Sequence, residues 1–98
     1  MPTPEQKIKK EIKDYIEKHN GIWFAITGGA YSKLGDPDII AFFGRTGVGI
    51  EAKTPTGKQS PIQKARQREM ERKGSIYIVV RSVGELEDEL RRNGIETD

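Results

Sequence analysis

The sequence contains no cysteine and only one histidine, His19, among its 98 residues. The absence of cysteine excludes disulfides, thiolate metal sites and cysteine nucleophiles. Hydrophobic residues make up only 34% of the chain, and no apolar run approaches the roughly 18 residues of a membrane span. The N-terminus is polar rather than signal-like. We therefore expect a soluble, cytoplasmic protein, and this length predicts a single domain over residues 1–98.

Charged residues make up 33% of the chain, and they are unevenly distributed along it. Residues 45–73 carry eight basic side chains against three acidic ones, whereas residues 74–98 carry three basic against six acidic. A basic middle next to an acidic tail indicates one cationic face, as a polyanion-binding protein would have. The alternative is a solvated helix of mixed charge.

Capping motifs, apolar periodicity and glycine-rich turns predict seven elements. The expected elements are a helix from 4 to 20, strands at 22–27, 38–43 and 48–53, a helix at 61–72, a strand at 75–81 and a helix from 83 to 93. A glycine-rich loop separates the first two strands, and a turn at 44–47 separates the second from the third. This order predicts an α/β protein with a mixed four-stranded sheet flanked by helices.

Two short motifs on the second and third strands suggest a metal site. Glu51 and Lys53 lie two residues apart, so both side chains point to one face of the sheet. With Phe43 opposite Val48, Lys53 would lie opposite Asp38 and all three polar groups would face the same way. Mg²⁺ favours such a site because it takes one or two carboxylates and keeps several waters. A structural salt bridge is the alternative.

Further groups could complete this site. The backbone carbonyl of Ala52 could supply another metal ligand, and Glu5 lies on the buried arc of the first helix, from which it could reach the metal. Glu5 could instead only stabilise the helix dipole. Gln63 could hold a water near the metal, or only cap its own helix as part of Ser60-Pro61-Ile62-Gln63. Aromatic residues such as Phe24 and Phe42 are interpreted as core rather than as base-stacking groups.

Four segments together resemble the virus-type replication-repair nuclease (VRR-Nuc) domain of the PD-(D/E)XK superfamily. These segments are Gly35-Asp36-Pro37-Asp38, the run from Glu51 to Lys58, Ser60-Pro61-Ile62-Gln63 and the run from Gly74 to Val83. The resemblance covers essentially the whole chain, in order. It implies a restriction-endonuclease-like αβββαβ core, here followed by a C-terminal helix, and cleavage of DNA with Mg²⁺ or Mn²⁺.

The resemblance also implies roles for individual residues. Asp38 and Glu51 match the family's metal ligands, Lys53 its catalytic lysine, Gln63 its characteristic glutamine and Glu5 its acidic residue in the first helix. Small stand-alone members are similar to Holliday-junction resolvases that act as homodimers, often in bacteria or phage-infected cells.

The leading hypothesis is a homodimeric, structure-selective DNA endonuclease. Its phosphate contacts are expected from the basic segment, at Lys58, Lys64, Arg66 and Arg45. Two alternatives stay open, namely a non-catalytic DNA-binding module and a nuclease acting on nicked, flapped or plain duplex DNA.

Overall fold

The computed structural model describes residues 2–26 and 35–97. Its elements are α1 (Pro4–Lys18), β1 (Ile22–Ala25), β2 (Ile39–Phe43), β3 (Thr46–Ala52), α2 (Pro61–Arg72), β4 (Ile76–Val80) and α3 (Val83–Arg92). The predicted order of helices and strands is confirmed. The end of the first predicted strand, at Thr27, and most of the glycine-rich loop lie outside the described residues.

Reciprocal capping defines the start of the first two helices. At α1 the Thr3 hydroxyl accepts the Gln6 backbone N–H, and the Gln6 side chain accepts the Thr3 N–H. Ser60 and Gln63 make the same two bonds at α2. Each pair satisfies backbone donors that the first helical turn leaves without partners, so the local sequence sets both boundaries.

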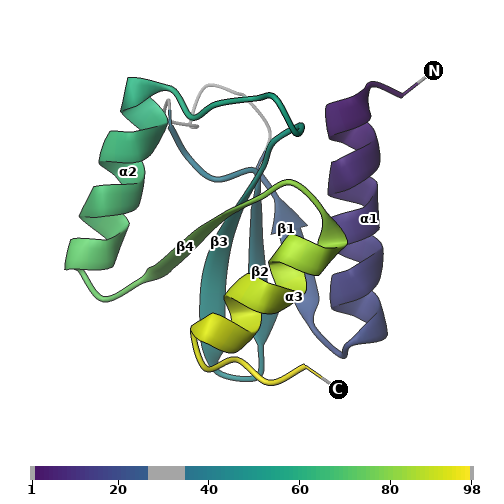
Figure 1. The fold of residues 1–98 in the computed structure, drawn as a ribbon. Coiled ribbons are helices and arrows are strands. Elements are labelled where there is room, and N and C mark those ends of the chain that lie inside the picture. Colours follow the sequence, from purple (N-terminus) through teal and green to yellow (C-terminus); the bar gives the residue numbers. More distant parts are fainter. Residues whose placement is uncertain (1, 27–34, 98) are drawn as a thin grey trace.

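The four strands form one mixed sheet in the order β1-β2-β3-β4. β1, β2 and β3 pair antiparallel, whereas β3 and β4 are parallel and are connected through α2. Figure 1 shows α1 and α3 next to each other on one face of the sheet, with α2 apart from both. No helix within the described ranges is both long and apolar enough to cross a bilayer.

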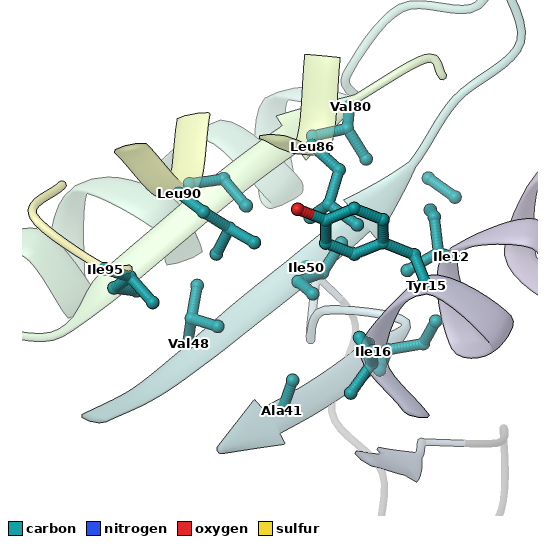
Figure 2. Packing of buried hydrophobic residues seen from close by; sticks show 13 residues of the cluster. Ile12, Tyr15, Ile16, Ala41, Val48, Ile50, Val80, Leu86, Leu90 and Ile95 are labelled. Atoms are coloured by element: carbon teal, nitrogen blue, oxygen red, sulfur yellow. The ribbon is translucent and has the colours of Figure 1, made fainter. Parts of the chain in front are cut away.

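The hydrophobic core lies between the sheet and the pair α1 and α3. Figure 2 shows side chains of both helices meeting alternate residues of β3, among them Val48 and Ile50. Leu86 and Leu90 of α3 are fully buried in this cluster. Burial of such side chains stabilises the fold by about 1.5–3 kcal/mol each. We call this side of the sheet the core face and the opposite side the α2 face.

The pairing of β2 with β3 differs from the prediction. Phe43 lies opposite Thr46 rather than Val48, a shift of two residues. The reason is the turn, which contains only Gly44 and Arg45, and Gly44 has the positive φ of 63° that such tight turns require. A shift of two residues preserves the alternation of faces, so the polar residues expected to share a face still do.

The interpretation of Phe24 and Phe42 as core residues is wrong. Phe24 on β1 and Phe42 on β2 are 58% and 42% exposed. Their rings make an edge-to-face contact, with centroids 6.3 Å apart. Both phenylalanines lie on the α2 face. The helix α2 packs against this face near β4 and near Gly49 of β3, which Met70 approaches, and so leaves the two phenylalanines on β1 and β2 uncovered.

Candidate functional site

The backbone of Asp38 is held between β1 and β3. Its N–H donates to the Ile50 carbonyl at 3.0 Å, and its carbonyl accepts the Ile26 N–H at 2.8 Å. The preceding Pro37 is buried, and its ring packs where a side chain at Gly49 would otherwise lie. A Cβ atom added at Gly49 would lie 3.1 Å from Pro37 Cγ. Glycine at this position therefore allows the Pro37-Asp38 pair to pack directly on β3.

The Asp38 carboxylate points toward the end of β3. Its Oδ2 accepts the Ala52 backbone N–H at 2.8 Å, and its Oδ1 lies 3.6 Å from Lys9 Nζ on α1. Lys9 Nζ also lies 3.7 Å from Glu5 Oε1. Glu5 is thus linked to Asp38 through an ammonium group, and its side chain is 45% exposed. Ala52 takes part in the site through its N–H.

Among residues 2–26 and 35–97, Glu51 is the one charged residue in the buried set, and it is wholly inaccessible to solvent. Extending the observed pairing by one residue places Glu51, rather than Lys53, level with Asp38. The Oε1 atom of Glu51 accepts the Tyr77 hydroxyl and the Gln59 amide, the latter at 3.4 Å. Its Oε2 atom is buried without a hydrogen-bond donor among the described residues and lies 3.5 Å from Lys53 Nζ.

Asp38, Glu51 and Lys53 are therefore gathered at the end of two adjacent strands, and we call them the carboxylate site. Their relative placement follows from strand alternation, because all three project to the α2 face. The ammonium groups of Lys9 and Lys53 offset the two carboxylate charges. Within the described residues, no three histidine, cysteine or acidic side chains converge as a metal-binding group.

Tyr77 on β4 is a member of the site that the sequence did not indicate. Burial raises the pKa of its hydroxyl far above the ordinary value, and the hydrogen bond to Glu51 and the charges of Glu51 and Asp38 act in the same direction. The hydroxyl therefore keeps its proton at neutral pH and acts as a donor. Its neighbours Ile76 and Ile78 pack toward the core, so alternation along β4 places Tyr77 on the α2 face.

Gln59 and Gln67, rather than Gln63, form the hydrogen bonds next to Glu51. Gln63 Oε1 accepts the Ser60 N–H in the capping box of α2. Gln59, in the loop before α2, donates to Glu51 and to Gln67 Oε1, the latter at 3.0 Å. Gln67 lies one helical turn beyond Gln63, so α2 does present glutamine toward the site. The predicted catalytic role of Gln63 stays a prediction.

The four basic residues expected to bind DNA are not equivalent. Lys58 and Lys64 are exposed, one in the loop after β3 and one on α2. Arg66 is half-buried and paired with Asp36 and Glu69. Arg45 lies in the β2–β3 turn, and the five residues of β2 separate it from Asp38 by about 17 Å at roughly 3.3 Å per residue. The structure therefore does not bring Arg45 to the carboxylate site.

A hollow of about 470 Å³ adjoins the site on the side of β4. Tyr77, Gln59 and Gln67 line it, together with residues of α3 such as Glu89. Asp38 and Glu51 do not line it. The hydrogen-bonded group of Tyr77 and the two glutamines thus separates the carboxylate site from this hollow.

Sequence reasoning missed Lys9, Tyr77 and Gln59. A tyrosine on the face of a strand opposite to its core residues would have been a usable signal for Tyr77. Lys9 follows Glu5 by four residues, which indicates an ion pair along the helix but not its contact with Asp38. Gln59 lies in a loop without periodicity, and nothing in the sequence indicates its contact with Glu51.

The arrangement is an α/β fold of the restriction-endonuclease type, with a mixed four-stranded sheet flanked by three helices. It is similar to a solved structure titled "VRR_NUC domain", with a TM-score of 0.78 and 24% sequence identity over 93% of this chain and 97% of that one. No family model and no curated protein sequence matches the chain.

The resemblance to VRR-Nuc domains noted in the sequence is thereby confirmed for the fold. At 24% identity the likeness establishes the architecture, and the chemistry has to be argued from the site itself.

Proposed function

We propose that this protein is a divalent-metal-dependent DNA endonuclease. The observation that carries the proposal is the pairing of two carboxylates, Asp38 and Glu51, at the same level of two adjacent strands beside Lys53. Two structural salt bridges, Lys9 with Asp38 and Lys53 with Glu51, would by themselves balance these charges. They would not explain why one carboxylate oxygen of Glu51 is buried without a hydrogen-bond donor in the described part of the chain. A buried carboxylate oxygen without a donor lowers the stability of the fold, and a role in binding a cation would explain why it is retained.

The carboxylate site fits a hard divalent cation such as Mg²⁺ or Mn²⁺. Asp38 Oδ1 and Glu51 Oε2 each have an ammonium group as their neighbour, at 3.6 and 3.5 Å, so neither oxygen is held by a short neutral hydrogen bond. These two oxygens would be the ligands, with Ala52 and Glu5 as proposed further contributors, Glu5 through a water. When bound, the cation would supply Lewis-acid polarisation of a phosphate and a more acidic water.

The chain's own residues have separate tasks in this proposal. Lys53 is 18% exposed, so its ammonium group can reach solvent and the substrate while it stays next to Glu51. It would orient the attacking water or offset negative charge on the phosphate during cleavage. Lys9 would balance the Asp38 charge from the side of α1. Gln63 is proposed as a further contact of water or phosphate, beyond its capping bond.

DNA binding would be driven by phosphate contacts next to the site. Lys58 and Lys64 are exposed, Lys58 in the loop after β3 and Lys64 on the first turn of α2, so they are the first candidates. Arg66 would join them if a phosphate replaced one of its acidic partners. Arg45 would contact DNA only at a distance from the scissile bond. Binding through phosphates is insensitive to base sequence and weakens with salt.

The finer proposal is a structure-selective enzyme that resembles Holliday-junction resolvases. Its support is the VRR-Nuc-like fold together with the resemblance of the sequence motifs. Two copies related by a two-fold axis would place two carboxylate sites on a symmetric four-way junction, so that both strands could be cut. We propose a homodimer acting on branched DNA in the bacterial cytoplasm or in phage-infected cells.

The test uses a labelled four-way junction with Mg²⁺, Mn²⁺ or EDTA. Cutting that needs the cation is expected in the wild type, and Asp38→Asn and Lys53→Ala should lose it while they retain most DNA binding in a mobility-shift assay. Lys10→Ala is the matched control, because Lys10 is an exposed lysine of α1 that pairs with Asp14 on its own helix. Full activity of Lys53→Ala would remove the mechanism. Nicked, flapped and plain duplex substrates at equal concentration test the selectivity.

A second candidate is a DNA-binding module without catalysis. It is favoured by the wholly buried position of Glu51 and by the lack of a third converging acidic side chain in the described ranges. In the same assay it predicts retention of the junction with no cutting under any metal condition.

A further inference from the structure

The two oxygens of the Glu51 carboxylate have different surroundings. Oε1 is held by two neutral donors, the Tyr77 hydroxyl and the Gln59 amide. Oε2 has no hydrogen-bond donor among the described residues and lies beside the Lys53 ammonium group. The two donors on Oε1 thus hold the carboxylate with Oε2 directed toward Lys53.

We propose that Tyr77 is a positioning residue of the carboxylate site, acting through Glu51 to keep Oε2 available as a cation ligand. The inference rests on the proposed function in one respect, namely that Glu51 is a metal ligand. Tyr77 itself would not touch the cation or the DNA. Its hydroxyl engages the second oxygen of the carboxylate, which limits Glu51 to binding through one oxygen.

The surroundings of Tyr77 suit this task. The residue is 3% exposed, so its hydrogen bond to Glu51 does not compete with bulk water. A hydrogen bond to an ionised acceptor is about twice as strong as a neutral one. Residues that hold metal ligands in this way commonly change metal affinity or activity by about 10–100-fold when they are mutated.

The support extends from Glu51 to α2. Gln59 Nε2 donates to Glu51 and also to Gln67 Oε1, and Gln67 Nε2 donates to Glu71 at 3.3 Å. α2 has no buried residue of its own, so these polar contacts are part of what attaches it to the sheet. Gln59 is thus a second, weaker positioning residue, because its contact with Glu51 is longer.

Tyr77→Phe tests the proposal, because it removes only the hydroxyl. Tyr15→Phe is the matched control, since the Tyr15 hydroxyl bonds Thr97 Oγ1 at 2.8 Å on the core face. Mn²⁺ affinity of the DNA-free protein is measured by calorimetric titration, and thermal midpoints are recorded for both variants. We expect Mn²⁺ affinity to fall about tenfold or more in Tyr77→Phe and to stay within about twofold in Tyr15→Phe.

A purely structural role of Tyr77 would change the thermal midpoint and not the affinity for Mn²⁺. If Tyr77 only satisfies a buried carboxylate, Tyr77→Phe would lower the thermal midpoint and leave the Mn²⁺ dissociation constant unchanged, and the proposal would be overturned. Gln59→Leu keeps the test decisive if Tyr77→Phe does not fold, and it should also weaken Mn²⁺ binding, by less than Tyr77→Phe because the Gln59 contact with Glu51 is longer. Unchanged affinity in that variant would overturn the proposal as well.

The outcomes separate this inference from the proposed function. Wild-type protein that binds Mn²⁺ but cuts no DNA would refute the nuclease, while a loss of Mn²⁺ affinity in Tyr77→Phe would still support the role of Tyr77. Wild-type cleavage with unchanged Mn²⁺ binding in Tyr77→Phe would refute the inference alone. No Mn²⁺ binding by the wild type would refute the inference directly.

Discussion

The buried ion pair between Glu51 and Lys53 leads to a prediction about stability. Lys53→Met keeps the length of the side chain and removes its charge, which leaves the buried Glu51 carboxylate without its ammonium partner. At 3.5 Å and an effective dielectric constant of about 20, the direct attraction is about 5 kcal/mol. The net effect is smaller, because the folded variant no longer pays the desolvation cost of the Lys53 ammonium group and because Tyr77 and Gln59 still donate to Glu51.

Removing one partner of a fully buried pair costs about 3–5 kcal/mol. Since Lys53 is 18% exposed, we expect the free energy of unfolding to fall by about 2–3 kcal/mol. Urea unfolding followed by circular dichroism, at neutral pH with EDTA, measures it. The control is Lys10→Met, because the Lys10–Asp14 pair has a shorter distance of 2.9 Å but is exposed to solvent, so its loss should lower the free energy of unfolding far less.

The second half of this test is a double variant. In Lys53→Met/Glu51→Gln the buried charge is gone, so much of the loss caused by Lys53→Met should be recovered, and the cycle should give a coupling energy above about 1 kcal/mol. Equal losses in Lys53→Met and Lys10→Met, or no coupling with Glu51, would refute the reasoning. Burial, and not distance, is the quantity that the comparison isolates.

Three further predictions concern the scaffold, each followed by the same urea unfolding. Leu90→Ala in the core should cost about 2–5 kcal/mol, and a loss below 1 kcal/mol would contradict its full burial. Ser60→Ala removes the N-cap of α2 and should cost about 1 kcal/mol, with faster amide exchange confined to that helix; uniform exchange throughout the protein would argue against it. Gly44→Ala and Gly84→Ala should change the free energy of unfolding in opposite directions. The first should lose about 1–2 kcal/mol because Gly44 has a φ of 63°, whereas the second should gain up to about 1 kcal/mol because Gly84 is helical and an added Cβ meets only Ser82 Oγ at 3.7 Å.

Local sequence signals predicted the elements well because each acts within a few residues. Thr3 and Ser60 mark helix starts through bonds to the third residue of their own helices. The gathering of Asp38 with Glu51 and Lys53 was also predictable, since it needs only alternation along strands. The predicted register was wrong by two residues because it depends on the turn, and the segment 44–47 has a glycine at each end, so the hairpin could close in more than one way.

Contacts between segments that lie far apart along the chain could not be predicted from the sequence. The bond from Tyr77 to Glu51 depends on β4 lying parallel to β3, and the contact of Lys9 with Asp38 depends on where α1 crosses the sheet. The exposure of Phe24 and Phe42 was missed for a similar reason. A hydrophobic pattern shows which side chains share a face, but it does not show whether a helix covers that face.

The division of β3 between two faces has a consequence for how this protein can change in evolution. Val48, Ile50 and Ala52 belong to the packed interior, whereas Glu51 and Lys53 carry the proposed chemistry from the same backbone. In a saturation screen of this strand, defects at the interior positions should be suppressed by compensating substitutions elsewhere that restore thermal resistance. Loss of activity caused by substitutions at Glu51 and Lys53 should persist in the stabilised background. Tolerance to substitution in that background would therefore alternate along β3 with a period of two residues.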